Sequence, residues 1–194
     1  MLKLPDSYIN NNPQIIDRVN EDLAKCNNMN YLFVGKTGIG KSYLAELIMD
    51  SINGSRQFYT AKSLVNKMSI YKTNKFADYP EKLRFLFNAR FVQNLVIDDI
   101  GTEENTDKNL WTVGSFIQDR CDYLSNAYQY RDKRRHKPLR TILTTNLSSE
   151  QMINNYGIRL WDRLKMCFVI MVFNDCKSFR NNYIEVLRDG QWIK

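Results

Sequence analysis

The sequence has no long hydrophobic run. Its longest apolar stretch, Cys167–Phe173, has seven residues, whereas roughly 18 are needed to span a bilayer. The first six residues lack the basic stretch and apolar region of a secretory signal peptide. The sequence therefore predicts a cytoplasmic protein without a membrane segment.

Histidine and closely spaced cysteines are also scarce. His136 is the only histidine, and the four cysteines are scattered without a C-x-x-C pair. They are Cys26, Cys121, Cys167 and Cys176. This pattern supports neither a zinc site nor a disulfide framework, so we expect free thiols.

Length and charge limit the remaining possibilities. At 194 residues and 43% hydrophobic composition, the chain is expected to form one domain with a single core. A formal net charge of +7 favours polyanionic partners. Part of this charge lies in the run Arg131–Arg140, just after Tyr128 and Tyr130. Such a run suits single-stranded nucleic acid, but a solvated loop would have the same composition.

The octapeptide Gly35–Ser42 matches the phosphate-loop pattern G-x-x-x-x-G-K-S/T. Its glycines allow the backbone to curl so that N–H groups point at phosphate oxygens. Lys41 is expected to reach the β and γ phosphates, and Ser42 to place its hydroxyl on Mg²⁺. The predicted nucleotide contacts are Gly35, Lys36, Thr37, Gly38, Ile39, Gly40, Lys41 and Ser42.

Apolar runs surround this loop and alternate with helical patterns along the chain. The predicted strands are Tyr31–Val34, Gln57–Thr60, Asn94–Ile97, Arg140–Thr144 and Cys167–Phe173. Helical spacing of apolar residues is seen at 44–48, 64–71, 80–87 and 110–124. Alternation of this kind predicts an α/β fold, in which a mostly parallel sheet is covered on both faces.

Two carboxylates end the third predicted strand. Asp98 and Asp99 follow Leu95-Val96-Ile97, as in a Walker B element that meets the phosphate loop at one edge of the sheet. Asp98 is expected to hold Mg²⁺, and Asp99 to orient or deprotonate the attacking water. Glu103 and Glu104 follow closely and compete with Asp99 for that role, unless they are simply solvated.

The fourth predicted strand ends in Thr144-Thr145-Asn146, whose polar groups are placed to hydrogen-bond the attacking water or the γ-phosphate. Asn146 is the residue we expect in that role, although the same residues also suit a helix cap. Farther on, Arg159 and Arg163 are spaced i and i+4, on one helix face. They suit anionic oxygens, and equally a surface salt bridge with Asp162 or Glu150.

Taken in order, these motifs resemble the AAA+ ATPases of the DnaC/DnaI helicase-loader family, which include IstB-like ATP-binding proteins. The resemblance spans residues 31–180. It is carried by the phosphate loop and by four further segments: Leu95–Glu103, Ile142–Ser148, Arg159–Leu164 and Lys177–Arg180. It implies a three-layer P-loop NTPase (AAA+, ASCE class) with strand order 5-1-4-3-2 and a minimal or absent lid. Residues 1–30 would be a short N-terminal extension, 31–180 the ATPase core, and 181–194 a tail or vestigial lid.

The resemblance also implies roles for single residues. Asn146 corresponds to the sensor 1 residue, Arg163 to an arginine finger that reaches a neighbouring subunit's ATP, and Arg180 to the sensor 2 arginine. Since a finger supplied in trans contributes about 10³–10⁵ in rate, an isolated monomer should hydrolyse ATP slowly. Arg159 and Arg180 are also predicted to contact the nucleotide.

The function implied is that of a DNA replication helicase loader. Such a protein binds ATP and Mg²⁺, oligomerises with ATP on single-stranded DNA and engages a replicative helicase. The compact size suits a phage, plasmid or other mobile element. Three alternatives stay open: an IstB-like transposition helper whose partner is a transposase, a small-molecule or nucleotide kinase, and an adaptor that binds ATP without turnover.

Overall fold

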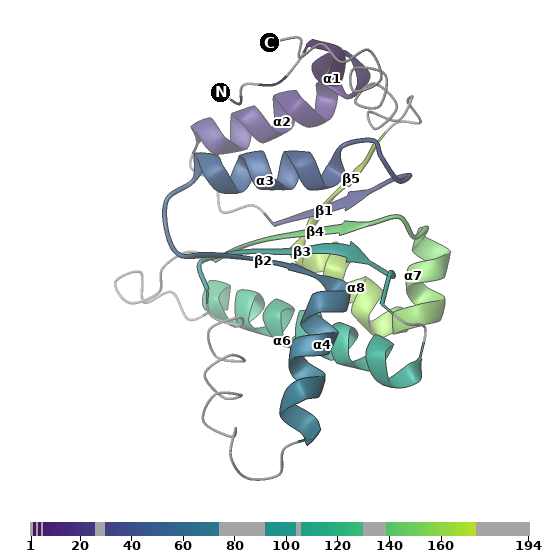
Figure 1. Cartoon of the computed structure of the whole chain (residues 1–194). Helices are drawn as coiled ribbons and strands as arrows, with labels where there is room; N and C mark the ends of the chain where they lie inside the picture. The colour runs from purple at the N-terminus through teal and green to yellow at the C-terminus, as the bar shows by residue number, and fades with distance from the viewer. Residues whose placement is uncertain are drawn as a thin grey trace, which may run out of the picture.

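The structure is a computed structural model that describes residues 2, 4, 6–25, 30–73, 92–103, 106–129 and 139–173 (Figure 1). Within these ranges, five strands form one sheet in the order β2-β3-β4-β1-β5, and all neighbouring pairs are parallel. The strands are β1 (Tyr31–Val34), β2 (Arg56–Thr60), β3 (Asn94–Ile100), β4 (Arg140–Thr145) and β5 (Val169–Val172). Read from the other edge, this is the predicted order 5-1-4-3-2, which is confirmed.

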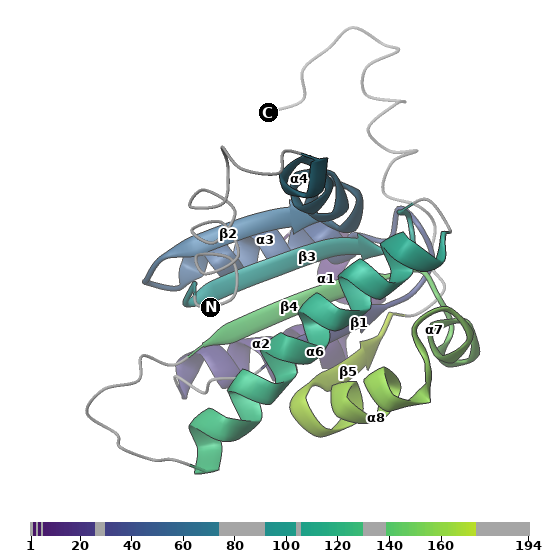
Figure 2. The ribbon, with the colours of Figure 1, turned by 90° about the horizontal axis from the view of Figure 1, so that it is seen from below.

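Helices cover both faces of the sheet, as Figure 1 shows. One face carries α1 (Asp6–Asn11), α2 (Pro13–Ala24) and α3 (Lys41–Ser51). The other carries α4 (Ala61–Thr73), α6 (Asp107–Gln129), α7 (Ser149–Tyr156) and α8 (Ile158–Cys167). From below, α6 crosses the sheet with α8 beside it (Figure 2). The predicted three-layer α/β fold is confirmed.

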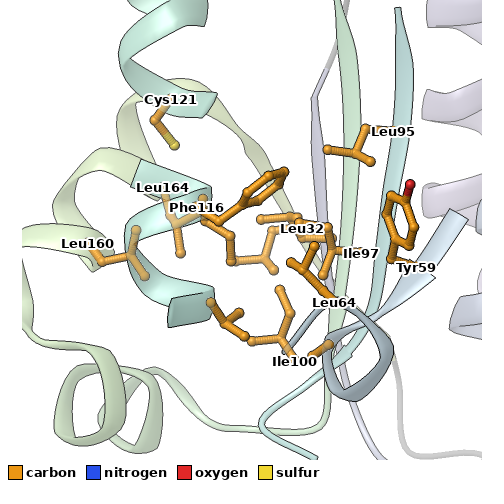
Figure 3. Close-up of a cluster of buried hydrophobic side chains, with 14 of the residues drawn as sticks. Leu32, Tyr59, Leu64, Leu95, Ile97, Ile100, Phe116, Cys121, Leu160 and Leu164 are labelled. Atoms are coloured by element: carbon orange, nitrogen blue, oxygen red, sulfur yellow. The ribbon is translucent and has the colours of Figure 1, made fainter. Parts of the chain in front are cut away.

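Along each strand, side chains point alternately to the two faces of the sheet, so the core consists of two clusters, one on each face. In β1, Leu32 packs into the cluster beneath α4, α6 and α8, whereas Tyr31 and Phe33 pack into the cluster beneath α2 and α3. This follows from the period of two in an extended strand. Figure 3 shows the first cluster, where Leu32 and Ile97 of the sheet meet helix residues such as Phe116. Together the two clusters bury both faces of the central strands.

The N-terminal helices are packed onto this core. Pro13 begins α2, where its missing N–H costs nothing. The buried carboxylate of Asp22 accepts a 2.8 Å hydrogen bond from the Tyr31 hydroxyl. Burial first, and then this hydrogen bond, raises the pKa of Tyr31 above its ordinary value. Helix α2 therefore contacts β1 directly.

Four of the five strands have bounds that differ from the sequence prediction, and the differences are largest at β5 and β3. The prediction of a strand at Cys167–Phe173 is wrong at its start, because α8 continues through Cys167 and Phe168 caps it. The strand at Asn94–Ile97 continues to Ile100. An apolar run does not show where a buried helix ends and a buried strand begins.

Several predictions lie outside the described residues. They are the helix near Pro80, the basic run except for Arg140, the roles of Glu104 and Arg180, the free thiols of Cys26 and Cys176, and the tail or vestigial lid at 181–194. Among the helices that the structure does describe, none has the length and apolar character of a membrane span.

Candidate nucleotide-binding site

The phosphate loop connects β1 to α3. Its first residue, Gly35, donates its N–H to the carbonyl of Thr145 at 3.2 Å, so the loop starts alongside the end of β4. Gly38 and Gly40 have φ of +85° and +90°, where a side chain would strain the backbone. Helix α3 begins at Lys41, so its N-terminus points into the loop as the motif predicts.

An N-terminal residue holds this loop from outside. Tyr8 of α1 is 2% exposed and donates its hydroxyl to the carbonyl of Gly40 at 2.8 Å. A Cβ on Gly40 would lie 2.2 Å from Cε2 of Tyr8. The Tyr8 ring also meets Tyr43 edge to face, with centroids 5.8 Å apart. No motif in the sequence predicts this role of Tyr8, because its only signal is an aromatic residue in a segment without a motif.

We expect Gly40→Ala to destabilise the fold and weaken nucleotide binding. Residue 40 would carry a side chain at positive φ and against Tyr8, and such strain costs about 1–3 kcal/mol. Thermal unfolding and the Kd of a fluorescent ATP analogue measure the two effects. Gly114→Ala is the control, because its Cβ would lie an ordinary 3.4 Å from Tyr156. Equal behaviour of the two variants would contradict the tight fit at Gly40.

Lys41 is buried inside the loop, with 4% exposure. Its Nζ donates to the carbonyls of Gly35 and Lys36, each at 2.8 Å, and to Oδ1 of Asn146 at 2.6 Å. The ammonium group therefore lies where the loop and the end of β4 meet. The two predicted site residues Lys41 and Asn146, 105 positions apart, are in direct contact.

Asp98 lies on the other side of the same site. It is 6% exposed, and its Oδ1 accepts hydrogen bonds from Ser42 Oγ at 2.7 Å and Thr144 Oγ1 at 2.6 Å. The predicted metal ligands Ser42 and Asp98 are thus brought together. Mg²⁺ in nucleotide sites is held by one or two protein oxygens, waters and substrate phosphates, and this hydroxyl–carboxylate pair fits that arrangement.

Phosphate oxygens would have to complete such a site. Within the part of the chain that the structure describes, no cluster of three or more His, Cys, Asp or Glu side chains is arranged to hold a metal ion. With a triphosphate bound, Mg²⁺ would neutralise charge on the phosphates, and Ser42 and Asp98 would hold it.

Asp99 has an unusual backbone. Its φ is +54°, and among the residues that the structure describes no other non-glycine residue has positive φ. The pairing of β3 with β4 shifts between Ile97 and Ile100, so Asp99 lies in a bulge. Its N–H donates to Thr144 Oγ1 at 2.9 Å. Bulges and strained residues of this kind aim side chains at functional sites.

The two threonines before Asn146 form hydrogen bonds within the protein. Thr144 and Thr145 are fully buried. Thr144 bonds both Asp98 and the Asp99 N–H, and the Thr145 hydroxyl donates to the carbonyl of Ile100 at 2.8 Å. Within this site they therefore fix β3 rather than face the γ-phosphate. Asn146, beyond the strand end, is exposed.

The arginines of α8 lie outside this group. Arg159 is exposed. Arg163, whose side chain is 36% exposed, forms an ion pair with Asp122 of α6. The alternative partner Asp162 instead pairs with Lys165 at 2.8 Å. Surface ion pairs contribute about 0–1 kcal/mol, so the pairing leaves Arg163 available for a stronger anionic partner.

Comparison with known proteins identifies the fold. No family model and no curated protein matches the sequence. Among solved structures, a DnaC helicase loader matches with a TM-score of 0.65 and 19% identity over 88% of this chain and 100% of its own. DnaI matches with a TM-score of 0.55 and 18% identity over 89% of this chain and 88% of its own.

A third similar structure is the replication initiator DnaA bound to AMPPCP and single-stranded DNA. It matches with a TM-score of 0.60 and 13% identity over 93% of this chain, which spans 52% of the DnaA chain. The chain thus has the fold of a P-loop AAA+ domain, and the similarity to DnaC and DnaI that the motifs predict is confirmed at the level of fold.

Proposed function

We propose that this protein is an AAA+ ATPase that acts as a DNA replication helicase loader. It binds ATP with Mg²⁺, assembles into ATP-bridged oligomers on single-stranded DNA, and engages a replicative helicase. Lys41 and the phosphate loop bind the triphosphate, Asp98 holds the metal, and Asp99 activates water. Arg163 completes the site of a neighbouring subunit.

The observation that carries the ATPase part is the convergence of four polar groups from three elements. Lys41 contacts Asn146, and Ser42 contacts Asp98, at 2.6 and 2.7 Å. A Gly-rich loop at a helix N-terminus faces a strand-end carboxylate and an amide. Nucleoside triphosphate hydrolysis requires this combination of phosphate cradle, metal ligand and water-orienting group.

The loader part is supported by the order of motifs and by the fold shared with a DnaC helicase loader and with DnaI. The net charge of +7 favours a polyanionic partner such as DNA. The exposed Arg159 and the partly exposed Arg163 of α8 suit contact with the phosphates of an adjacent subunit.

Turnover at increasing protein concentration tests this proposal. We expect ATP hydrolysis per molecule to rise with concentration and with added single-stranded DNA, because each site needs a neighbour. Lys41→Ala is expected to abolish turnover in both conditions. Particle mass, measured with a nonhydrolysable ATP analogue and an oligonucleotide, should increase in parallel.

A specific rate independent of concentration and DNA would contradict assembly on DNA. A phosphorylated nucleoside or nucleotide would instead identify a kinase, and binding without turnover would identify an adaptor. Pull-down with purified replicative helicase or transposase from the native host separates a loader from an IstB-like helper, since the two share every motif described above.

A further inference from the structure

Glu103 lies in the turn that follows β3 and is buried, with 4% exposure. An acidic side chain in a loop is ordinarily solvated, and burying its charge is costly unless donors surround it. Here its Oε2 accepts the N–H of Gly101 at 2.9 Å, and its Oε1 accepts the hydroxyl of Tyr156. Both carboxylate oxygens are thus bonded within the protein.

Tyr156, which donates to Glu103, lies 53 positions farther along the chain. It is the last residue of α7 and packs against the core beneath α6 and α8. Burial first, and then the hydrogen bond that the hydroxyl donates to Glu103, raises the pKa of Tyr156 above its ordinary value. The phenol therefore stays protonated and donates to Glu103.

The backbone that Glu103 holds is the one that carries Asp99. Gly101 has φ of +97° and lies so close to Leu147 that a Cβ would be 2.6 Å from Leu147 Cδ1. Between Asp99 and Glu103, the Thr102 N–H and hydroxyl both donate to the carbonyl of Asp99, at 3.1 and 2.7 Å. The turn is thus fixed at its start by Thr102 and at its end by Glu103.

We propose that Glu103 and Tyr156 are positioning residues for ATP hydrolysis. They hold the turn after β3 against α7, so that the strained backbone of Asp99 presents its carboxylate to the attacking water. This role rests on the ATPase function proposed above. It also accounts for a buried carboxylate that contacts none of Lys41, Ser42 and Asp98 in the hydrogen bonds of the described site.

The same contacts argue against Glu103 as the general base. A base must reach the water at the γ-phosphate. Glu103 instead points at the N–H of Gly101, two residues before it, and at Tyr156 of α7. Asp99 is less buried and lies beside Asp98, which is the predicted metal ligand.

The test compares Tyr156→Phe, Glu103→Gln and the double variant. Tyr156→Phe keeps the ring in the core and removes only the hydroxyl. We expect each single variant to lower kcat about tenfold, because a misplacement of about 1 Å can cost 10²-fold in rate. The Kd of a nonhydrolysable ATP analogue should stay within about twofold. The double variant should be no slower than the worse single variant, since the residues act as one unit.

Two controls separate positioning from stability. Tyr59→Phe removes the hydroxyl of another buried tyrosine, which donates to Gln57 at 3.0 Å. Glu150→Gln neutralises an exposed glutamate on α7. Neither should change kcat. Thermal unfolding of every variant shows whether lost activity follows lost folding.

Each other outcome overturns the inference. Unchanged kcat in both single variants, or a loss of affinity equal to the loss of rate, leaves no positioning role. If Glu103→Gln abolishes turnover while Tyr156→Phe is unaffected, Glu103 is the base instead. If wild-type protein binds ATP but never hydrolyses it, the proposed ATPase function fails, and the positioning role fails with it. Normal wild-type turnover with unaffected variants refutes the positioning role alone.

Discussion

If Arg163 is the proposed finger, Arg163→Ala is expected to lower ATP turnover by about 10³–10⁵ at protein concentrations where the wild type assembles, which is the usual contribution of an arginine finger supplied in trans. Its guanidinium would otherwise neutralise charge that develops on a neighbour's γ-phosphate. Binding of a nonhydrolysable analogue should change little, because the loop of the same chain is intact. Steady-state hydrolysis over a concentration series, with and without single-stranded DNA, measures the effect.

The ion pair with Asp122 supplies the control for this experiment. Asp122→Asn breaks the intrachain pair and keeps the arginine, so turnover should stay near that of the wild type. Lys165→Ala removes an exposed cation from the same helix and should also be neutral. If Asp122→Asn is as slow as Arg163→Ala, then Arg163 acts by holding α8 to α6.

Mixing two inactive variants tests whether Arg163 acts on the ATP of a neighbouring subunit. Arg163→Ala has an intact phosphate loop, and Lys41→Ala has an intact Arg163. In a mixed oligomer, some loops of the first variant would face arginines of the second, and turnover should partly return. A mixture as inactive as its components would refute a finger supplied in trans.

Asp99→Asn is expected to slow single-turnover ATP cleavage by about 10²–10⁴, which is the usual contribution of a general base. Asparagine is the suitable replacement, because it is enriched at positive φ, as aspartate is, and so preserves the bulge at φ +54°. ATP affinity should change little. Rapid mixing of excess enzyme with labelled ATP measures cleavage directly.

Asp17→Asn, at an exposed position on α2, is the matched control for this variant. It removes the same charge from the chain without touching the site. Equal cleavage rates for wild type and Asp99→Asn would mean that Asp99 is not the general base. Asn146 would then remain as the residue proposed to orient the water.

The sequence was sufficient for the parts of the site that lie within motifs. The loop at 35–42 and the carboxylate Asp98 each end or follow a strand, and parallel strands bring such ends to one edge. The alternation of elements predicted the layers, and the resemblance supplied the strand order. These features depend on local pattern and on topology, both of which can be read from one chain.

The contacts that sequence analysis missed depend on pairs of residues far apart. Tyr8 reaches Gly40 across 32 positions, and Glu103 reaches Tyr156 across 53. Neither tyrosine belongs to a motif, and burial of Glu103 requires donors that only the fold brings near. The hydrogen bonds of Thr144 and Thr145 could not be predicted for the same reason, since their partners lie on the adjacent strand β3.

During synthesis, β1 leaves the ribosome long before either of its partners. It pairs with β4 and β5, and residues 35–139 separate it from β4. At about 5–20 residues per second, translation of that interval takes roughly 5–20 s. Through this time β1 lacks both of its strand partners. The bonds from Gly35 to Thr145 and from Lys41 to Asn146 form only afterwards, so a nascent chain should acquire ATP binding late, and abruptly.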